Sequence, residues 1–429
     1  MVIGGGIAGI QASSDLANRG FKVYLVEKSP SIGGRMAQLD KTFPTMDCSM
    51  CILAPKMIEC ARHPNVQLLT YSEVRGVNGS VGNFKVKVVR KPRYVDETKC
   101  TGCGICSDNC PAEAPNEFDE NLGIRKAIYM PFPQAVPRLV TVDKDNCIEC
   151  GLCENVCPAN AVNREQQPEE IVLDVGAIVV ATGFDMFDPS VIPQYGYKRF
   201  KNVITAMELE RTLCASGPTG GHLIRPSDGK IPRSIAFIQC VGSRDRRKWI
   251  DHPYCSSICC KYAVKDAVLI KEHEPDSRVT IFYIDMRAFG RGFQEFVNRA
   301  KSEFGILFIR SNPGEISENP NTNNLIVWFE DLITRTVHNA TFDLVVLCPT
   351  LIPRKGVEEL AKILGVELDN YGFFKSVDAV KKPLDTTVPG IFACGYCLGP
   401  KTGDVPDSVA QGSATAGRIA EVLAGMEVS

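Results

Sequence analysis

Two runs of cysteine carry the most specific chemistry in the sequence. Both have the spacing C-x2-C-x2-C-x3-C-P, in which three close thiolates can cap one face of an iron–sulfur cubane. The fourth cysteine of each run lies too far along the chain to close on the same cluster, so it would serve the other one. The spacing therefore predicts two 4Fe-4S clusters, one on Cys100, Cys103, Cys106 and Cys157, the other on Cys147, Cys150, Cys153 and Cys110.

Structural zinc is the alternative use of these thiolates, because four cysteines can also form a tetrahedral zinc site. Paired runs that each end in Cys-Pro favour crossed cubanes instead. The sequence has 19 cysteines, and no secretory signal precedes its first strand. We therefore expect a cytoplasmic protein whose thiols are kept reduced, which favours metal binding over a disulfide scaffold.

A glycine motif at the start of the chain predicts a dinucleotide site. Gly4 to Gly9 reads G-x-G-x-x-G between an apolar strand and a helical stretch, and an acidic residue follows about 20 residues later. The three motif glycines would form the turn, admit the pyrophosphate and allow close helix packing, while the acid would reach the ribose hydroxyls. The predicted contacts are Gly4, Gly6, Ile7, Ala8, Gly9, Glu27 and Lys28.

Three further segments favour FAD over NAD as the dinucleotide. They resemble the second glycine motif, the Ala-Thr-Gly turn and the closing flavin segment of flavoproteins with two dinucleotide-binding domains. Their predicted contacts are Gly34, Arg35, Ala181, Thr182, Gly183, Gly395, Asp407, Ser408 and Gln411. One position departs from that pattern, because Gly395 is followed by Tyr396 where an aspartate is usual. Asp404 or Asp407 is the expected substitute.

A second nucleotide-binding pattern begins near residue 231 but lacks its glycines. Apolar strands at 234–238 and 278–284 flank a helical stretch at 262–272, which predicts a βαβ unit. The expected glycine motif is replaced by Gln239-Cys-Val-Gly-Ser-Arg244, so the phosphate cradle is spoiled. Four cysteines converge there, and we predict a third cluster of unusual ligand geometry on Cys240, Cys255, Cys259 and Cys260. Free buried thiols and a disulfide are the alternatives.

The remaining cysteines give weaker signals. Cys48, Cys51 and Cys60 follow the flavin motif and could be redox-active thiols, ligands to a partner's cofactor or packing residues. Four others are expected to pack in the core: Cys214, Cys348, Cys394 and Cys397.

The dispersal of these segments predicts an α/β protein with three domains. An FAD-binding Rossmann-like domain would comprise residues 1–91, 169–230 and 351–429, with a ferredoxin module inserted at 92–168 and a second Rossmann-like domain at 231–350. The formal net charge of −2 gives no reason to expect nucleic acid or an anionic membrane surface as a partner. No apolar stretch approaches the roughly 20 residues that span a bilayer, so we expect a soluble protein.

Longer segments make the chain resemble the HdrA iron–sulfur flavoproteins of heterodisulfide reductase and their bacterial relatives. These segments lie at residues 43–56, 93–103, 239–244, 254–260 and 406–411. The resemblance implies FAD in a thioredoxin-reductase-like fold, two inserted ferredoxin clusters and an irregular 4Fe-4S cluster on the Cys240 quartet. It also implies a lysine near the flavin N5, which matches Lys265.

The resemblance further implies work inside a soluble complex. The expected partners are cluster-bearing subunits, together with an electron donor such as a hydrogenase or formate dehydrogenase, and a homodimer is expected within the complex. The expected function is electron transfer between flavin and clusters, including flavin-based bifurcation. The alternatives are an NAD(P)H-dependent disulfide or ferredoxin oxidoreductase, which needs an intact second glycine motif, and a non-catalytic electron-wiring scaffold.

Overall fold

The computed structural model describes residues 1–332, 334–400 and 403–427. Contacts divide the chain into two compact units. The first unit contains residues 1–37, 50–184 and the chain from Pro353 onward, and the second contains residues 38–49 and 185–352.

The first unit is built on a seven-stranded sheet of order β22–β23–β24–β11–β1–β2–β3. Its strands are β1 (Val2–Ile3), β2 (Val23–Glu27), β3 (Val66–Thr70), β11 (Ile178–Val180), β22 (Ser376–Asp378), β23 (Lys382–Thr386) and β24 (Ile391–Ala393). The strands from β24 to β3 are parallel, whereas β22 and β23 pair antiparallel. All residues of β1, β11 and β24 are buried, as expected for parallel strands covered on both faces.

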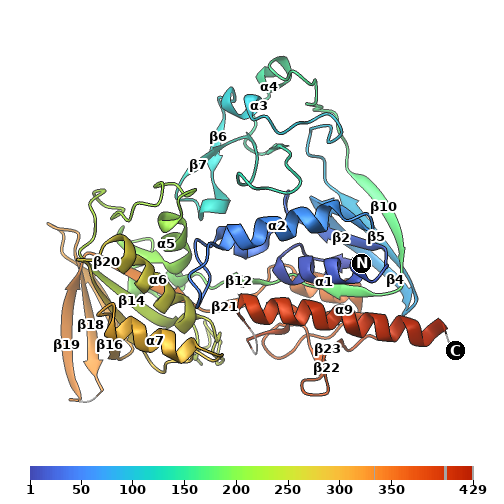
Figure 1. The fold of residues 1–429 in the computed structure, drawn as a ribbon. Helices are drawn as coiled ribbons and strands as arrows, with labels where there is room; N and C mark the ends of the chain where they lie inside the picture. Colours follow the sequence, from blue (N-terminus) through green and yellow to red (C-terminus); the bar gives the residue numbers. More distant parts are fainter. Residues whose placement is uncertain (333, 401–402, 428–429) are drawn as a thin grey trace. The chain divides into compact units, whose positions relative to one another are not determined.

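Four of the described helices lie wholly or mainly in this unit outside the predicted insertion: α1 (Ile7–Asn18), α2 (Ser49–Arg62), α8 (Val357–Leu364) and α9 (Val405–Glu427). The first and last of them, α1 and α9, pack side by side (Figure 1). Gly412 permits this close approach, because a Cβ atom there would lie 2.6 Å from the carbonyl oxygen of Ala8. Helices from the two ends of the chain thus form one layer of the unit.

A second sheet shows how the ferredoxin module is inserted. It has the antiparallel order β10–β5–β4, with β4 (Ser72–Ser80), β5 (Asn83–Arg90) and β10 (Glu169–Val175). Arg90 at the end of β5 pairs with Glu169 at the start of β10. The segment 91–168 therefore leaves and re-enters the sheet at adjacent positions, and its short elements are α3 (Ile105–Asp108), α4 (Leu152–Asn155), β6 (Glu113–Pro115), β7 (Ile124–Lys126), β8 (Ile128–Tyr129) and β9 (Thr141–Val142).

A buried arginine ties this segment to the rest of the unit. The Arg93 side chain is 1% exposed, and its Nη2 donates to the Pro30 carbonyl and to Thr70 Oγ1, both at 2.6 Å. Its Nη1 donates to Thr141 Oγ1 inside the inserted segment at 2.8 Å. One guanidinium thus joins the insertion to the end of β3 with charge-assisted hydrogen bonds.

The second unit contains the predicted strand–helix–strand pattern, which is confirmed. Its parallel sheet has the order β13–β20–β14–β15–β16. The strands are β13 (Val203–Thr205), β14 (Ser234–Val241), β15 (Arg278–Tyr283), β16 (Leu307–Arg310) and β20 (Leu344–Pro349), and the helices are α5 (Ala206–Leu213), α6 (Cys259–His273) and α7 (Phe293–Ser302). An antiparallel sheet of β17 (Glu315–Glu318), β18 (Leu325–Asp331) and β19 (Thr336–Phe342) precedes β20.

The structure draws the border of this unit earlier than the predicted residue 231. Residues 185–230 fall in the second unit because β13 pairs in parallel with β20, Val203 lying opposite Val345. The separate segment 38–49 joins the same unit through Phe43, whose ring meets Phe293 and Phe296 edge-on. The strands β12 (Phe184–Met186) and β21 (Leu351–Pro353) contain the other two borders.

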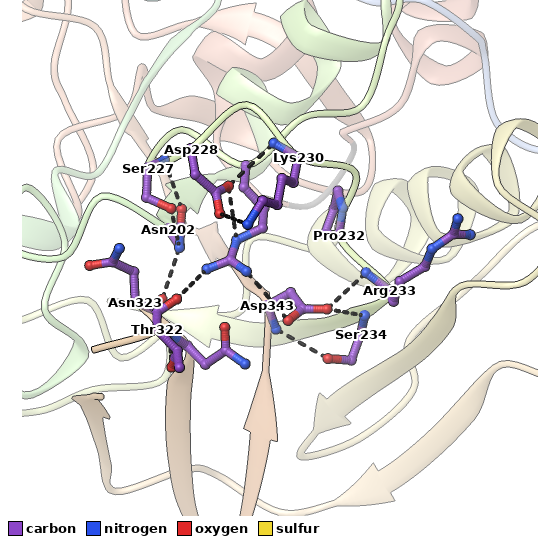
Figure 2. Close-up of polar contacts among 12 residues, drawn as sticks. Asn202, Ser227, Asp228, Lys230, Pro232, Arg233, Ser234, Thr322, Asn323 and Asp343 are labelled. Atoms are coloured by element: carbon purple, nitrogen blue, oxygen red, sulfur yellow. Dashed lines mark hydrogen bonds and ion pairs between the residues drawn. The ribbon is translucent and has the colours of Figure 1, made fainter. Parts of the chain in front are cut away.

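Polar contacts fix the amino ends of three parallel strands of the second unit (Figure 2). Asn202, just before β13, donates to Ser227 Oγ at 3.0 Å and to the Asn323 carbonyl at 2.9 Å. Asp343, just before β20, accepts from the backbone amides of Arg233 and Ser234 at the start of β14. These bonds set the strands in register, so the residues at their opposite, carboxyl ends are held at defined positions.

No helix in the described ranges combines the length and apolar character needed to cross a bilayer.

Candidate functional site

The predicted dinucleotide contacts lie at one edge of the first unit's sheet. Gly4 follows β1, Ala181 follows β11 and Cys394 follows β24, and these three strands are parallel neighbours. Their carboxyl ends therefore meet at one edge, where parallel α/β sheets bind ligands. The structure thus gathers three segments that are separated by more than 170 residues in the sequence.

Two motif glycines are required by close packing. Gly4 has φ +107°, and a Cβ atom there would lie 2.4 Å from the Ala181 carbonyl oxygen. A Cβ atom at Gly9 would lie 1.9 Å from the Gly4 carbonyl oxygen. No larger side chain fits at either position, so the first turn of α1 lies directly against the ends of β1 and β11.

The middle glycine faces open space instead. A Cβ atom at Gly6 would meet only the Cα atom of Gly34, at 4.0 Å, and one at Gly183 would meet nothing within 4 Å. Gly6 also precedes the first residues of α1, Ile7 and Ala8, whose helix start can bind a phosphate. This cradle fits a pyrophosphate that approaches the backbone closely.

The acidic residue at the end of β2 is held by the glycine loop. Glu27 Oε2 accepts from the Gly5 amide at 2.6 Å, and its Oε1 accepts from the Ser29 amide at 2.7 Å. Lys28, beside it, is an exposed side chain near Glu73. Among the predicted contacts at the end of β2, Glu27 is therefore the one built into the loop.

The predicted contact Arg35 is engaged with the inserted segment. Its Nη1 atom lies 2.9 Å from Glu120 Oε1. This ion pair joins the second glycine motif to the ferredoxin module within the first unit.

The closing segment forms the start of α9 and meets α1. The Gly395 amide donates to Gln411 Oε1 at 2.7 Å, and Gly395 has φ +76°, where a Cβ atom would lie 3.0 Å from that of Ala8. Asp404 Oδ1 accepts from the Asp407 amide at 2.8 Å, and the Ser408 amide donates to the Asp404 carbonyl. Asp404 thus caps α9, a role in which its carboxylate satisfies the helix start.

Gly34→Ala tests this cradle. Gly34 has φ +59°, and its Cβ atom would lie 2.8 Å from the Cα atom of Gly6. We expect the substitution to push the two glycine loops apart and to weaken FAD binding by at least about tenfold, since strain and close approach cost more than about 1 kcal/mol. Retained FAD per protein, measured from flavin absorbance after dilution, gives the affinity. Gly20→Ala, at a position that also has positive φ but open space around its Cβ atom, is the matched control.

The four cysteines predicted for the first ferredoxin cluster line one cavity. Cys100, Cys103 and Cys106 of the first run meet Cys157 of the second run around it. Burial raises the pKa of the Cys106 thiol to about 11, with the negative charges of the other three cysteines adding to the effect. The structure thus brings together the four cysteines of the crossed assignment, and a positively charged cluster core would relieve this repulsion.

Three cysteines of the second predicted quartet lie at the edge of the module's small core. Cys110, Cys147 and Cys153 lie with Cys157 at the edge of one small core, and Cys150 is exposed. Backbone amides point at cysteine sulfurs in this part of the chain: Glu149 donates to Cys147 Sγ at 3.4 Å, and Ala161 to Cys157 Sγ at 3.3 Å. Such amide–sulfur bonds are typical of ferredoxin clusters.

The third predicted quartet lies at the carboxyl end of β14 in the second unit. The strand is irregular between Ile238 and Val241, and Cys240 there has φ +60°. Cys259 and Cys260 begin α6, the helix that follows. Cys255 precedes that helix, and its sulfur accepts from the Ser257 amide at 3.4 Å. The bulge turns Cys240 toward the start of α6, which brings the cysteines together where a nucleotide would bind in an intact Rossmann fold.

The sulfurs of this quartet are strongly coupled. The thiols of Cys240 and Cys260 donate hydrogen bonds to Cys259 and hold its pKa well below the ordinary value. The same bonds, together with burial, raise the pKa of Cys240 and of Cys260. Metal ligation needs thiolates, and a bound cluster would replace the two shared protons.

The side-chain amide of Gln239 indicates that the third quartet could hold a cluster. Cys260 Sγ lies 3.3 Å from Gln239 Oε1, while Gln239 Nε2 is buried and has no acceptor among the described residues. A buried donor that has no acceptor and lies beside a cysteine quartet can donate a hydrogen bond to a sulfur of a cluster or of a cysteine. Within the described ranges, no group of three or more His, Cys, Asp or Glu side chains is arranged to hold a single metal ion.

Comparison with known proteins finds similarity to one group of redox subunits. The 4Fe-4S dicluster domain family matches residues 99–162, and the NAD(P)-binding Rossmann-like domain family matches residues 2–57. The chain is 56% identical over 429 residues to an iron–sulfur subunit of the CoB–CoM heterodisulfide reductase of Methanopyrus kandleri. It is 53% identical over 420 residues to the corresponding subunit of the H2:CoB–CoM heterodisulfide,ferredoxin reductase of Methanothermobacter marburgensis. Along its whole length the chain is thus similar to the HdrA subunits of heterodisulfide reductases.

These matches include nearly all of this chain but only part of each relative. The matches include 100% and 98% of this chain but only 65% and 63% of the two relatives. The chain therefore spans less than two thirds of their length.

Solved structures confirm the predicted fold. The thioredoxin reductase of Lactococcus lactis matches with a TM-score of 0.55 at 16% identity, covering 99% of this chain and 98% of that one. The thioredoxin reductase of T. acidophilum matches with a TM-score of 0.53 at 15% identity, covering 100% and 98%. The fold of this HdrA-like chain is thus thioredoxin-reductase-like, and the chain also contains the dicluster domain.

The lysine singled out by the family resemblance is deeply buried. Lys265 lies on α6 of the second unit with 2% of its side chain exposed. Its Nζ atom pairs with Glu210 of α5, and Asp266 Oδ1 lies 2.8 Å away. Neither carboxylate was singled out in the sequence, because a helical acid gives no sign that its partner comes from another helix.

The cysteines outside the three quartets differ from one another. Cys48 and Cys51 are disulfide-bonded, whereas Cys60 is a free thiol whose pKa burial raises to about 11. Burial likewise raises the pKa of Cys397 to about 12. The other three residues expected to pack are two fully buried thiols and one half-buried thiol, which are Cys348, Cys394 and Cys214 respectively.

Proposed function

We propose that this chain is the FAD- and iron–sulfur-bearing electron-transfer subunit of a heterodisulfide-reductase-type complex, and hence part of an oxidoreductase. The observation that carries the proposal is the combination in one chain of a flavin-type glycine cradle and three cysteine quartets, two of them in a dicluster domain. FAD can exchange electrons in pairs, whereas each 4Fe-4S cluster accepts one electron at a time.

The residues of the chain have separate roles in this proposal. The open backbone at Gly6 and Gly34 admits the pyrophosphate, and the start of α1 stabilises its charge. The crossed quartets would hold two clusters, and the Cys240 quartet would hold a third. The Gln239 Nε2 group would donate a hydrogen bond to the third cluster and so adjust the reduction potential of that cluster. Lys265 is proposed, from the family resemblance, to place positive charge near the flavin N5.

The names of the relatives suggest the reaction of the whole complex. One is called a reductase of both CoB–CoM heterodisulfide and ferredoxin, with H2 as donor. We propose that this subunit divides electron pairs between two such acceptors, with other subunits contributing the donor and the heterodisulfide site. The partners would be a hydrogenase or formate dehydrogenase and cluster-bearing subunits, with the complex in the cytoplasm and the chain paired as a homodimer.

The geometry favours this function over NAD(P)H oxidation. Cys240 occupies the turn of the second nucleotide fold, and Gly242 there is already packed by Phe187, whose ring would lie 2.4 Å from an added Cβ atom. Asp285, at the position where an acid binds ribose, pairs with Arg244 at 2.8 Å. A nicotinamide dinucleotide would have to displace both contacts.

Anaerobic purification tests the proposal. We expect about twelve irons and about twelve acid-labile sulfides per FAD, as three 4Fe-4S clusters require. NAD(P)H should leave the flavin of the isolated chain oxidised. Zinc without labile sulfide, or direct bleaching of the flavin by NAD(P)H, would overturn the proposal. Isolation of the native complex under the same conditions identifies the partner subunits.

A further inference from the structure

Two neighbouring loops beside the third cysteine quartet form a basic surface. The basic rim consists of residues 243–251, between Cys240 and Cys255, and residues 285–291, after β15. These loops carry six basic and three acidic side chains, an excess of three positive charges in a chain whose net charge is −2. The two loops are therefore locally positive, and the rest of the chain is net negative.

Two of the three acidic residues of the basic rim are engaged internally. Asp285 Oδ2 lies 2.8 Å from Arg244 and 3.7 Å from Arg287, which links the two loops. Asp245 accepts from Arg247 Nε at 2.9 Å. These pairs use arginines of the rim itself, so they hold the loops together without reversing their charge.

The exposed charge of the basic rim is mainly positive. Arg246, Lys248 and Arg291 are exposed, and none of them takes part in an ion pair within the part of the chain that the structure describes. Asp251 is the exposed acid among them. The three cations against one carboxylate leave a net positive face toward a partner.

Exposed aromatic rings stand among these cations. Trp249 is 68% exposed and Phe289 is 60% exposed. Arg247 lies over the Trp249 ring, 5.5 Å from its centroid. Exposed aromatic side chains with arginine neighbours have the composition of protein-interface anchors, which are enriched in Trp and Arg.

The same loops contact the third quartet directly. Cys260 Sγ lies 3.4 Å from the Asp285 carbonyl oxygen, and the Arg287 amide donates to the Cys260 sulfur. These two contacts leave no other residue between the second loop of the rim and the quartet. A protein bound on the basic rim would therefore sit one residue layer from the third cluster.

We propose that the basic rim is the docking site of a small acidic protein that carries a one-electron centre. One electron would pass from the reduced third cluster to the oxidised carrier, or in reverse, with no bond made or broken. The carrier is acidic because the rim is positive, and it is a protein because Trp249 and Phe289 offer a wide apolar contact that a dinucleotide would not cover. This inference rests on the proposed function for the presence of the third cluster.

Charge reversal in the holoprotein tests the proposal. The variant is Arg246→Glu/Lys248→Glu, and the probe is an oxidised, acidic two-cluster ferredoxin. We expect its association rate constant at low ionic strength to fall at least about tenfold, because complementary charges steer association. The difference should shrink at high salt, which screens exposed charges. Trp249→Ala should weaken binding by about tenfold with little salt dependence.

The matched control changes the same charge elsewhere on this unit. Lys201→Glu/Arg278→Glu reverses two exposed cations near the amino ends of β13 and β15, at the opposite edge of the sheet. Association with the ferredoxin should remain within about twofold of the unmodified protein. Equal rates for both double variants would overturn the proposal, and so would NADPH binding that depends on Arg246 and Lys248.

Iron content separates the two possible failures. Carrier binding is measured with oxidised partners, so it requires no electron transfer. If the chain lacks a third cluster, iron and labile sulfide fall to about eight per FAD, and the proposed function is wrong in that respect. If the iron content is that of three clusters but ferredoxin binding does not depend on the charges of the basic rim, only the docking proposal is wrong.

Discussion

Replacing Cys157 by alanine is expected to remove the cluster of the first cysteine run, not that of its own run. Cys157 lines one cavity with Cys100, Cys103 and Cys106, although 51 positions separate it from the last of these. A cubane that loses one of four thiolate ligands loses an iron or the whole cluster. We expect iron to fall by up to about four per chain, and Mössbauer spectra of enriched protein to show which cluster is gone.

Double variants make this assignment independent of which signal belongs to which cluster. Cys157→Ala/Cys106→Ala should lose no more iron than the greater of its single variants, because both residues serve one site. Cys157→Ala/Cys153→Ala should lose iron from both sites, up to about eight per chain. Cys214→Ala, outside the three quartets, should keep its full iron content. If the Cys157/Cys153 pair behaves as one site and the Cys157/Cys106 pair as two, the ligation is not crossed.

The dicluster domain could be predicted from the sequence because ferredoxin-type ligation leaves a fixed local spacing in each of the two cysteine runs. The flavin cradle could be predicted for a similar reason, since Gly4 and Gly9 are positions where any Cβ atom collides with backbone. Both signals arise from contacts within a turn or a short loop. The strand–helix–strand core of the second unit was visible because β14 and β20 are buried along their whole length and mainly apolar.

The border of the second unit could not be predicted in this way. β13 has only three residues, and its pairing with β20 joins positions more than 140 residues apart. Asn202 and Asp343 fix the strand ends through hydrogen bonds that no spacing indicates. The left-handed backbone of Cys240 is equally hidden, because cysteine rarely adopts positive φ and gives no glycine signal. The features that escaped prediction therefore depend on long-range pairing rather than on local chemistry.

Replacing Lys265 by methionine is expected to destabilise the second unit strongly. Its ammonium lies between Glu210 and Asp266, whose side chains are 3% and 0% exposed. Removing one partner from a buried ion pair leaves an uncompensated charge and costs about 3–5 kcal/mol. The measurement is the urea midpoint of the holoprotein, with hydrogen exchange of α6 as the local readout.

The pH dependence of this loss distinguishes buried charge from lost packing. Burial already raises the pKa of Asp266, Lys265 lowers it and Asp40 raises it further. Without Lys265 the folded-state pKa of the Asp266 carboxyl rises still further above its unfolded value, so the folded state binds the extra proton. Stability of Lys265→Met should therefore fall as pH rises above about 4, and the deficit against the unmodified protein should shrink in acid.

Neutralising the carboxyls should rescue the variant. Lys265→Met/Glu210→Gln/Asp266→Asn leaves no buried charge in the cluster, and similar replacements of buried ion pairs by neutral groups are often neutral or stabilising. We expect most of the lost stability to return at neutral pH and the pH dependence to disappear. If the loss of stability is independent of pH and persists in the triple variant, it arises from the lost packing of the lysine side chain and not from buried charge. Flavin potentials in the rescued protein then report the charge effect of Lys265 in a folded background, where an unchanged titration would exclude its proposed place near N5.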